Sequence, residues 1–179
     1  MAMLLGCVRP ASDATSGQES AEGSIAEQAE IVRSGLSSQI RIDRGLVRDE
    51  DLKVLEGLES NLLRVNLSRT EITDAGLALL CRLKNLEQLR LSSPHVTDFG
   101  MANLKKLEKL RFLHLLDAPI TDAGLDQLHG LTSLESVYLD RTQVTDDGIA
   151  RLLEALPRIH LHLDDHHHPL DPQAKTHEH

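Results

Sequence analysis

Leucine and other branched apolar residues recur along the chain at a fixed spacing. The same pattern begins at Leu62, Leu86, Leu110 and Leu134, so the separations (86−62, 110−86 and 134−110) are all 24 residues. In each copy, apolar residues occupy offsets 0, 3, 5 and 10. A Thr-Asp-x-Gly segment follows, and then apolar residues at helical spacing. A constant period of this length indicates a solenoid, in which each repeat packs only against its neighbours.

Each repeat predicts a short strand followed by a helix. The Leu-x-x-Leu-x-Leu part alternates between apolar and variable positions, which is typical of a strand with one buried face. The residues expected as helix N-caps are Thr73, Thr97, Thr121 and Thr145. The residues expected in the first turn, where the helix dipole favours a carboxylate, are Asp74, Asp98, Asp122 and Asp146. We interpret these carboxylates as structural, and we expect the glycines that follow to let each helix start approach the strand layer.

The ends of the repeat array differ from its middle. Ser24 and Glu27 form a capping-box pattern, followed by Ile25, Ala29 and Val32 at helical spacing. This predicts a helix over about residues 25–34 that covers the first layer of the stack. Residues 40–61 read as a degenerate first repeat, aligned with the second at a shift of 25. Residues 159–163 predict a final strand, the sixth.

The full pattern, L-x-x-L-x-L-x-x-T-x-I-T-D-x-G-L-x-x-L-x-x-L, resembles leucine-rich repeat proteins of the ribonuclease-inhibitor-like, cysteine-containing class, whose 24-residue variety occurs in many bacterial proteins. The resemblance covers roughly residues 40–164. It implies a right-handed α/β solenoid, with a parallel sheet on the concave face and helices outside, that works in protein–protein interaction. Pro94 and Ala118 replace the Thr found at positions 70 and 142, so a side-chain ladder at this turn is expected to be interrupted.

Composition narrows the classes of partner. The net charge of −9 argues against a nucleic-acid surface, which would present a basic stripe. The same charge favours a monomer, because like-charged copies repel one another. No apolar run approaches the roughly 18 residues of a membrane-spanning helix. We therefore expect a protein partner, no cofactor, and contact with a membrane only through a lipid anchor.

The first residues are compatible with two cellular locations. Leu4-Leu5-Gly6-Cys7 resembles the lipobox of bacterial lipoproteins, in which the cysteine is lipidated. However, no basic residue precedes it, and the apolar run is shorter than a normal signal-peptide core. Either Cys7 anchors the protein to a membrane, or the match is chance and the protein is cytoplasmic. We expect residues 1–23 to be a disordered leader or spacer, 24–165 the capping helix and repeats, and 166–179 a flexible His-rich tail.

The concave face, defined as the sheet face opposite the helices, carries the outward side chains of each strand. The third and second strands place Arg90 and Arg64 there, while the fourth and fifth place large apolar and aromatic residues. Aromatic residues and arginine are the usual anchors of interfaces. We hypothesise a partner-binding patch, named here the concave patch, made of Arg64, Arg90, Phe112, His114, Leu116 and Tyr138. The alternative is that these are isolated surface aromatics of no special role.

A second candidate lies at the C-terminal end. His160 and His162 share one strand face, with Asp164 two residues further, and zinc is bound by such side chains. The alternative function is therefore a metal-binding or structural envelope protein that uses this His-rich end. Catalysis is not expected, because no nucleophile neighbours a base in a recognisable motif and no phosphate loop is present. Cys81 reads as a small, partly buried apolar residue of a helix rather than a reactive thiol.

Overall fold

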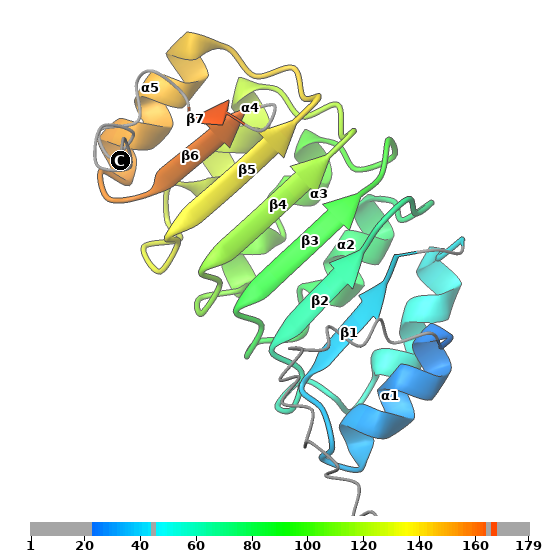
Figure 1. The fold of residues 1–179 in the computed structure, drawn as a ribbon. Helices are drawn as coiled ribbons and strands as arrows, with labels where there is room; N and C mark the ends of the chain where they lie inside the picture. Colours follow the sequence, from blue (N-terminus) through cyan, green and yellow to red (C-terminus); the bar gives the residue numbers. More distant parts are fainter. Residues whose placement is uncertain (1–22, 44–45, 164–165, 168–179) are drawn as a thin grey trace, which may run out of the picture.

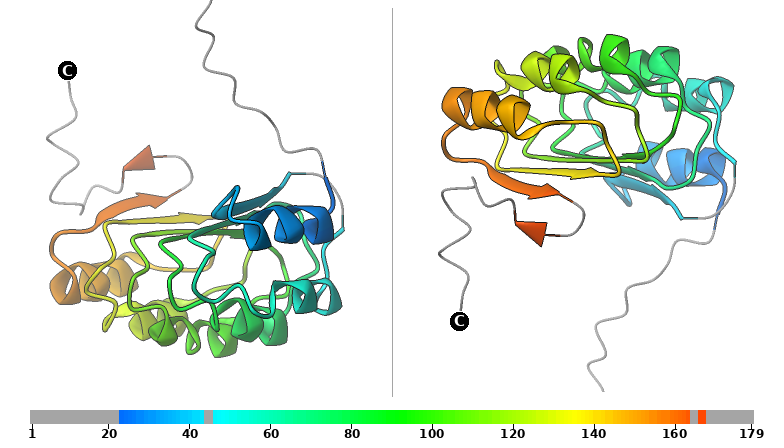
Figure 2. Two further views of the ribbon diagram at one scale, coloured as in Figure 1. Left: turned by 90° about the horizontal axis from the view of Figure 1, so that it is seen from below. Right: turned by 90° about the horizontal axis from the view of Figure 1, so that it is seen from above.

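The computed structural model describes residues 23–43, 46–163 and 166–167. These residues form one layer of strands and one layer of helices (Figures 1 and 2). The strands lie side by side in chain order: β1 (Gln39–Ile42), β2 (Arg64–Leu67), β3 (Gln88–Ser92), β4 (Phe112–Leu116), β5 (Ser136–Asp140) and β6 (His160–Leu163). All six are parallel, which confirms the predicted sheet.

A seventh strand was not predicted. The two-residue β7 (His166–His167) pairs with β6 in the antiparallel direction. It falls within the segment expected to be a flexible tail, so the sheet continues past the last parallel strand. Apart from β7, the domain boundaries expected after residues 23 and 165 remain predictions.

Short helical segments return the chain from one strand to the next on the other layer. They are η1 (Asp49–Leu55), α2 (Asp74–Leu80), α3 (Asp98–Met101), η2 (Leu104–Lys106), α4 (Asp122–Leu125), η3 (Asp126–Leu128) and α5 (Asp146–Ala155), where η marks a 3₁₀ helix. The helix α1 (Ile25–Arg33) precedes β1 and lies beside it. In the middle repeats a single α-helical turn gives way to a 3₁₀ turn or a loop. The predicted N-caps are confirmed, since each cap threonine accepts a hydrogen bond from a backbone N–H of its helix's first turn.

The apolar offsets of the repeat all lie between the two layers. In the third repeat, Leu89, Leu91, Val96, Met101 and Leu104 are at most 1% exposed. Equivalent residues of neighbouring strands are paired, with a register shift of 24 from Arg64 to Gln88 and onward, and of 25 from Gln39 to Arg64. The alignment of the degenerate first repeat is therefore confirmed. One continuous core runs through all the layers.

The aspartates of the Thr-Asp-x-Gly segments link each repeat to the next. Asp98 accepts hydrogen bonds from the backbone N of Thr121 at 2.8 Å and from its Oγ1 at 2.6 Å. The same pair of bonds joins Asp49 to Thr73, Asp74 to Thr97, and Asp122 to Thr145. The predicted structural role of these carboxylates therefore extends to the next repeat as well as their own helix. Each one orients the N-cap threonine of the following repeat.

The glycines of these segments make room for the aspartates. A Cβ on Gly148 would lie 2.3 Å from Oδ1 of Asp122, and one on Gly100 would lie 2.3 Å from Oδ1 of Asp74. Gly76 and Gly124 face Asp49 and Asp98 in the same way. The expectation that glycine lets the helix approach the strand layer was wrong, because its nearest neighbour is the carboxylate of the preceding repeat.

The first edge of the sheet is covered by α1, as predicted. Its capping box forms, with Ser24 and Glu27 bonded reciprocally. Gln28 is 5% exposed, and its Nε2 donates to the carbonyl of Arg41 at 2.7 Å while its Oε1 accepts from the Arg41 N–H at 2.8 Å. The side-chain amide thus takes the place of a neighbouring strand, and satisfied edge groups do not template pairing with another chain.

The turn after each strand is bridged despite the missing threonines. Thr70 Oγ1 donates to the carbonyl of Ser92, and Ser92 Oγ donates to Asp117 Oδ2 at 2.9 Å. Arg141 Nη2 then donates to the same Asp117 oxygen at 2.9 Å. The predicted ladder of like side chains is interrupted, but Ser92, Asp117 and Arg141 continue the connection with different chemistry.

We expect a non-additive double mutant at the last aspartate and glycine pair. Asp122→Ala removes both bonds from Thr145 and should cost about 1–3 kcal/mol of unfolding free energy. Gly148→Ala should cost a similar amount, about 1–3 kcal/mol, because its methyl group overlaps the carboxylate. Together they should cost less than the sum, because the overlap disappears, and urea unfolding followed by circular dichroism measures all three variants. Gly130→Ala, with nothing within 4 Å of the added Cβ, is the matched control. Strict additivity would contradict this account.

Cys81 should be unreactive in the folded protein. It is fully buried, and burial raises the pKa of its thiol to about 12, with Lys106 lowering it to a lesser extent. Since the thiolate is the reactive species, a disulfide reagent at neutral pH should leave the native thiol intact. In a Cys7→Ser variant, Cys81 is the single cysteine, and its thiol should titrate only after unfolding in urea. Rapid modification without denaturant would show that the site is open.

Candidate functional site

The predicted patch residues share the concave face. Outward and buried positions alternate along β2 and β4, and along β3 and β5 up to the last residue, so the buried apolar residues point to the helices and the residues between them point away. Arg64 is exposed, and the half-buried members are Arg90, Phe112, His114, Leu116 and Tyr138. The register sets Phe112 beside Gln88 and Ser136, and His114 beside Arg90 and Tyr138.

Three rings form a ladder across the last three parallel strands. The centroids of His114 and Tyr138 are 5.1 Å apart, with the rings tilted by 36°. Tyr138 and His162 are stacked, with centroids 4.2 Å apart and planes 9° from parallel. The ladder arises because the three residues occupy the same offset in consecutive repeats and are therefore paired in register. Tyr138 is thus held between two imidazole rings.

His114 is also fixed by a carboxylate. Its Nε2 lies 2.6 Å from Oδ2 of Asp140, which is 6% exposed. Because a carboxylate only accepts, Nε2 carries the proton in this contact. Asp140 is not among the residues predicted for the concave patch. Its position, one strand over and two residues on from His114, is the signal that was available.

The remaining patch residues have few constraints. Phe112 has one specific neighbour, the Arg111 guanidinium, 5.3 Å from its ring centroid. Arg111 itself is held by two bonds to Glu135. Leu116 lies at the end of β4, opposite Asp140 in register. Phe112 and Leu116 therefore present apolar surface from the two ends of one strand, on either side of the ring ladder.

Comparison with known proteins agrees with this architecture. A family model described as Leucine Rich repeat matches residues 60–81, which hold the second strand and its helix. The matched repeat and the fold are those of leucine-rich repeat proteins. A search of curated protein sequences found no significant match.

Solved structures of other leucine-rich repeat proteins share the fold. An internalin from Listeria monocytogenes superposes with a TM-score of 0.60 at 22% identity, over 78% of this chain and 37% of the internalin. A leucine-rich repeat protein from Leptospira interrogans gives a TM-score of 0.56 at 19% identity, over 74% of this chain and 33% of the other. This chain thus spans about a third of the length of each of these two structures. Likeness at this identity establishes the fold.

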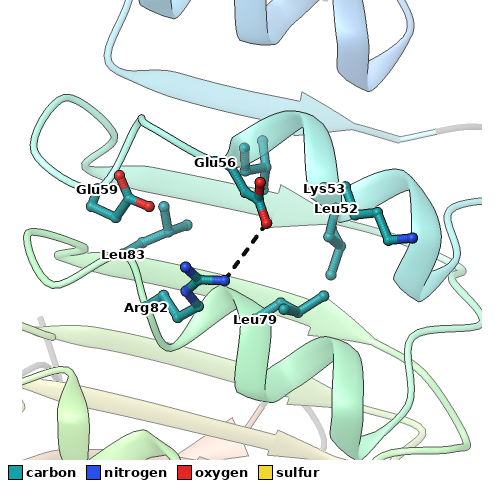
Figure 3. Close-up of a pocket in the computed structure, with 8 residues that line it drawn as sticks. Leu52, Lys53, Glu56, Glu59, Leu79, Arg82 and Leu83 are labelled. Atoms are coloured by element: carbon teal, nitrogen blue, oxygen red, sulfur yellow. Dashed lines mark ion pairs between the residues drawn. The ribbon is translucent and has the colours of Figure 1, made fainter.

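One pocket among the described helical segments is too small for a ligand. A shallow pocket lies between η1 and α2, closed on one side by the ion pair of Arg82 with Glu56 at 3.7 Å (Figure 3). Its enclosed space is about 20 Å³, enough for about one water molecule. Small-molecule sites are an order of magnitude larger, at about 300–1,000 Å³.

The described residues do not test the whole of the candidate metal site. Within the described residues, no group of three or more His, Cys, Asp and Glu side chains is placed to hold a metal ion. His160 and His162 lie on β6, but the ring of His162 is stacked on Tyr138. Asp164, the third proposed ligand, lies outside the described residues, as does Cys7. A search of the described helices for one long and apolar enough to cross a membrane found none.

The ring ladder should contribute to stability through its aromatic character. Tyr138→Phe keeps both ring contacts and should be close to the original protein in unfolding free energy. Tyr138→Leu keeps apolar bulk but loses both contacts, each of which is worth about 0.5–1.5 kcal/mol beyond buried area. Thermal and urea unfolding followed by circular dichroism compare the two variants. Equal stability of the Leu and Phe variants would mean that the stacking contributes nothing.

Proposed function

We propose that this protein is a non-catalytic binding module that holds a partner protein on its concave face. Leucine-rich repeat folds commonly serve as protein–protein interaction modules. The observation that carries the proposal is the set of large apolar and aromatic side chains held half-exposed on β4 and β5. The first three parallel strands present Arg, Asn, Gln, Ser and Asp at the equivalent positions.

The chemistry of the patch supports an interface over the alternative of scattered surface residues. Isolated exposed apolar side chains are ordinary, but here Phe112 and Leu116 flank His114 on one strand, and His114 is paired with Tyr138 on the next. Tyr138 and His114 are also held in place by their neighbours, so binding would cost little side-chain entropy. Rigid aromatic residues surrounded by polar ones are the usual anchors of protein interfaces.

The size of the face suggests the kind of partner. Six strands spaced ~4.8 Å apart, each about five residues long, give a surface on the order of 400 Å². A standard interface buries about 800 Å² on each partner. The concave face alone is therefore suited to a short extended segment or a narrow projection of the partner.

The proposal is tested by capture of proteins from a native lysate of the source organism. The test variant carries Phe112→Ala and Leu116→Ala. Neither side chain takes part in the ring ladder, so the ladder should remain intact. The matched control is Phe99→Ala, which removes an 86%-exposed phenylalanine from the helix layer. We expect the original protein and the control to capture the same partner in similar amounts. The double variant should capture at least ten-fold less of it.

Two results would contradict binding at the concave patch. If the double variant captured the same proteins in the same amounts, the concave patch would not be the binding site. If only Phe99→Ala lost the partner, the binding surface would lie on the helix layer instead. Circular dichroism of each variant establishes that the fold is retained before capture.

A further inference from the structure

The arginines of this acidic protein fall into two groups. Most of those described pair with carboxylates, for example Arg111 with Glu135 and Arg141 with Asp117. Within the described part of the chain, three have no ion pair or side-chain hydrogen bond: Arg64, Arg69 and Arg90. All three lie on β2, on β3 or directly after β2. The unneutralised arginines are therefore gathered at one place, although the net charge is −9.

The surroundings of these arginines contain no competing carboxylate on the sheet. The outward positions of β2 and β3 are Arg64, Asn66, Ser68, Gln88, Arg90 and Ser92, none of them acidic. Asp43, on the first-strand side, is held by Arg41 at 2.6 Å. Asp140, on the other side, is held by His114. The nearest acids on the concave face already have partners of their own.

Arg90 also has unused hydrogen-bonding capacity. Its side chain is half-buried, and its Nε is buried with no acceptor in the described structure. The base of the guanidinium is therefore covered by neighbouring atoms, and no salt bridge holds the side chain. Such an arginine loses less conformational freedom on binding than a free surface arginine, and its planar fork matches a carboxylate in two-point contact.

The register places this positive region next to the apolar one. Arg90 is paired with His114, while Arg64 is separated from Phe112 only by Gln88. With strands ~4.8 Å apart, the distance from Arg64 to Phe112 across the sheet is about 10 Å. An extended chain covers that distance in about three residues. One short segment can therefore contact both regions at once.

We propose that the partner presents an acidic segment, whose carboxylates pair with Arg64 and Arg90 while a neighbouring apolar side chain packs against Phe112 and Leu116. This inference rests on the proposed binding function of the concave face and adds the chemistry of the partner. A polynucleotide is the other source of negative charge, and the acidic remainder of the molecule would repel its long charged backbone.

The experiment selects binders from a displayed library of random 12-residue peptides on the immobilised full-length protein. We expect the selected peptides to be enriched in Asp and Glu next to an apolar residue. Their affinity should fall at least ten-fold on Arg64→Glu with Arg90→Glu, and it should weaken as salt is raised. The matched control is Lys84→Glu with Lys105→Glu, which changes the net charge equally at exposed positions outside the strands and should leave affinity unchanged.

Each other outcome has a definite meaning. Suppose that the selected peptides no longer bind the variant with Phe112→Ala and Leu116→Ala, but carry no excess of acidic residues and still bind the variant with both arginines changed to Glu. This result would overturn the inference of an acidic segment and leave the proposed binding function intact. A library that yields no binder dependent on Phe112 and Leu116 would count against both. If the lysine control weakened peptide affinity equally, the effect would come from net charge alone and the inference would be wrong. Tighter binding of a single-stranded oligonucleotide through the same arginines would replace the acidic segment with a nucleic acid.

Discussion

The contact on which the structure depends is the one between each aspartate and the threonine of the next repeat. A core of leucines is favourable in any register, because one leucine fills the place of another. The two bonds from Thr121 to Asp98, and their equivalents along the stack, are directional and form in one register only. They also fix the N-cap of the next helix, so the position of each repeat follows from that of the one before it.

This link explains why the glycine of each segment is invariant within the chain. The carboxylate occupies the volume that a Cβ would need, as the 2.3 Å approach of Asp122 to Gly148 illustrates. Aspartate, threonine and glycine therefore act as one unit spread over two repeats. With stacking secured on this side of the solenoid, the outward positions of the strands are free to vary. The concave face uses that freedom, carrying unpaired arginines on β2 and β3 and rings on β4, β5 and β6.

The ends of the sheet are handled by different means. At the first edge, the buried side chain of Gln28 satisfies both backbone groups of Arg41, where a further strand would otherwise pair. At the last parallel strand, β7 pairs with β6 in the opposite direction. Neither device repeats, so neither leaves a periodic signal in the sequence. The first device covers the edge at β1, and the second extends the sheet beyond β6.

The sequence by itself determined the solenoid, its six parallel strands, the register, the N-caps and the identity of the outward residues. These follow from a constant period and from alternation, both of which can be read directly from the order of residues in the chain. Only the tertiary structure decided that Asp122 accepts a hydrogen bond from Thr145, and that the lack of a Cβ at Gly148 leaves room for Asp122. The same is true of the stacking of His162 on Tyr138. Each of these joins residues at least 23 positions apart through a particular side-chain direction. Periodicity specifies which residues are neighbours, whereas side-chain packing decides what they do for one another.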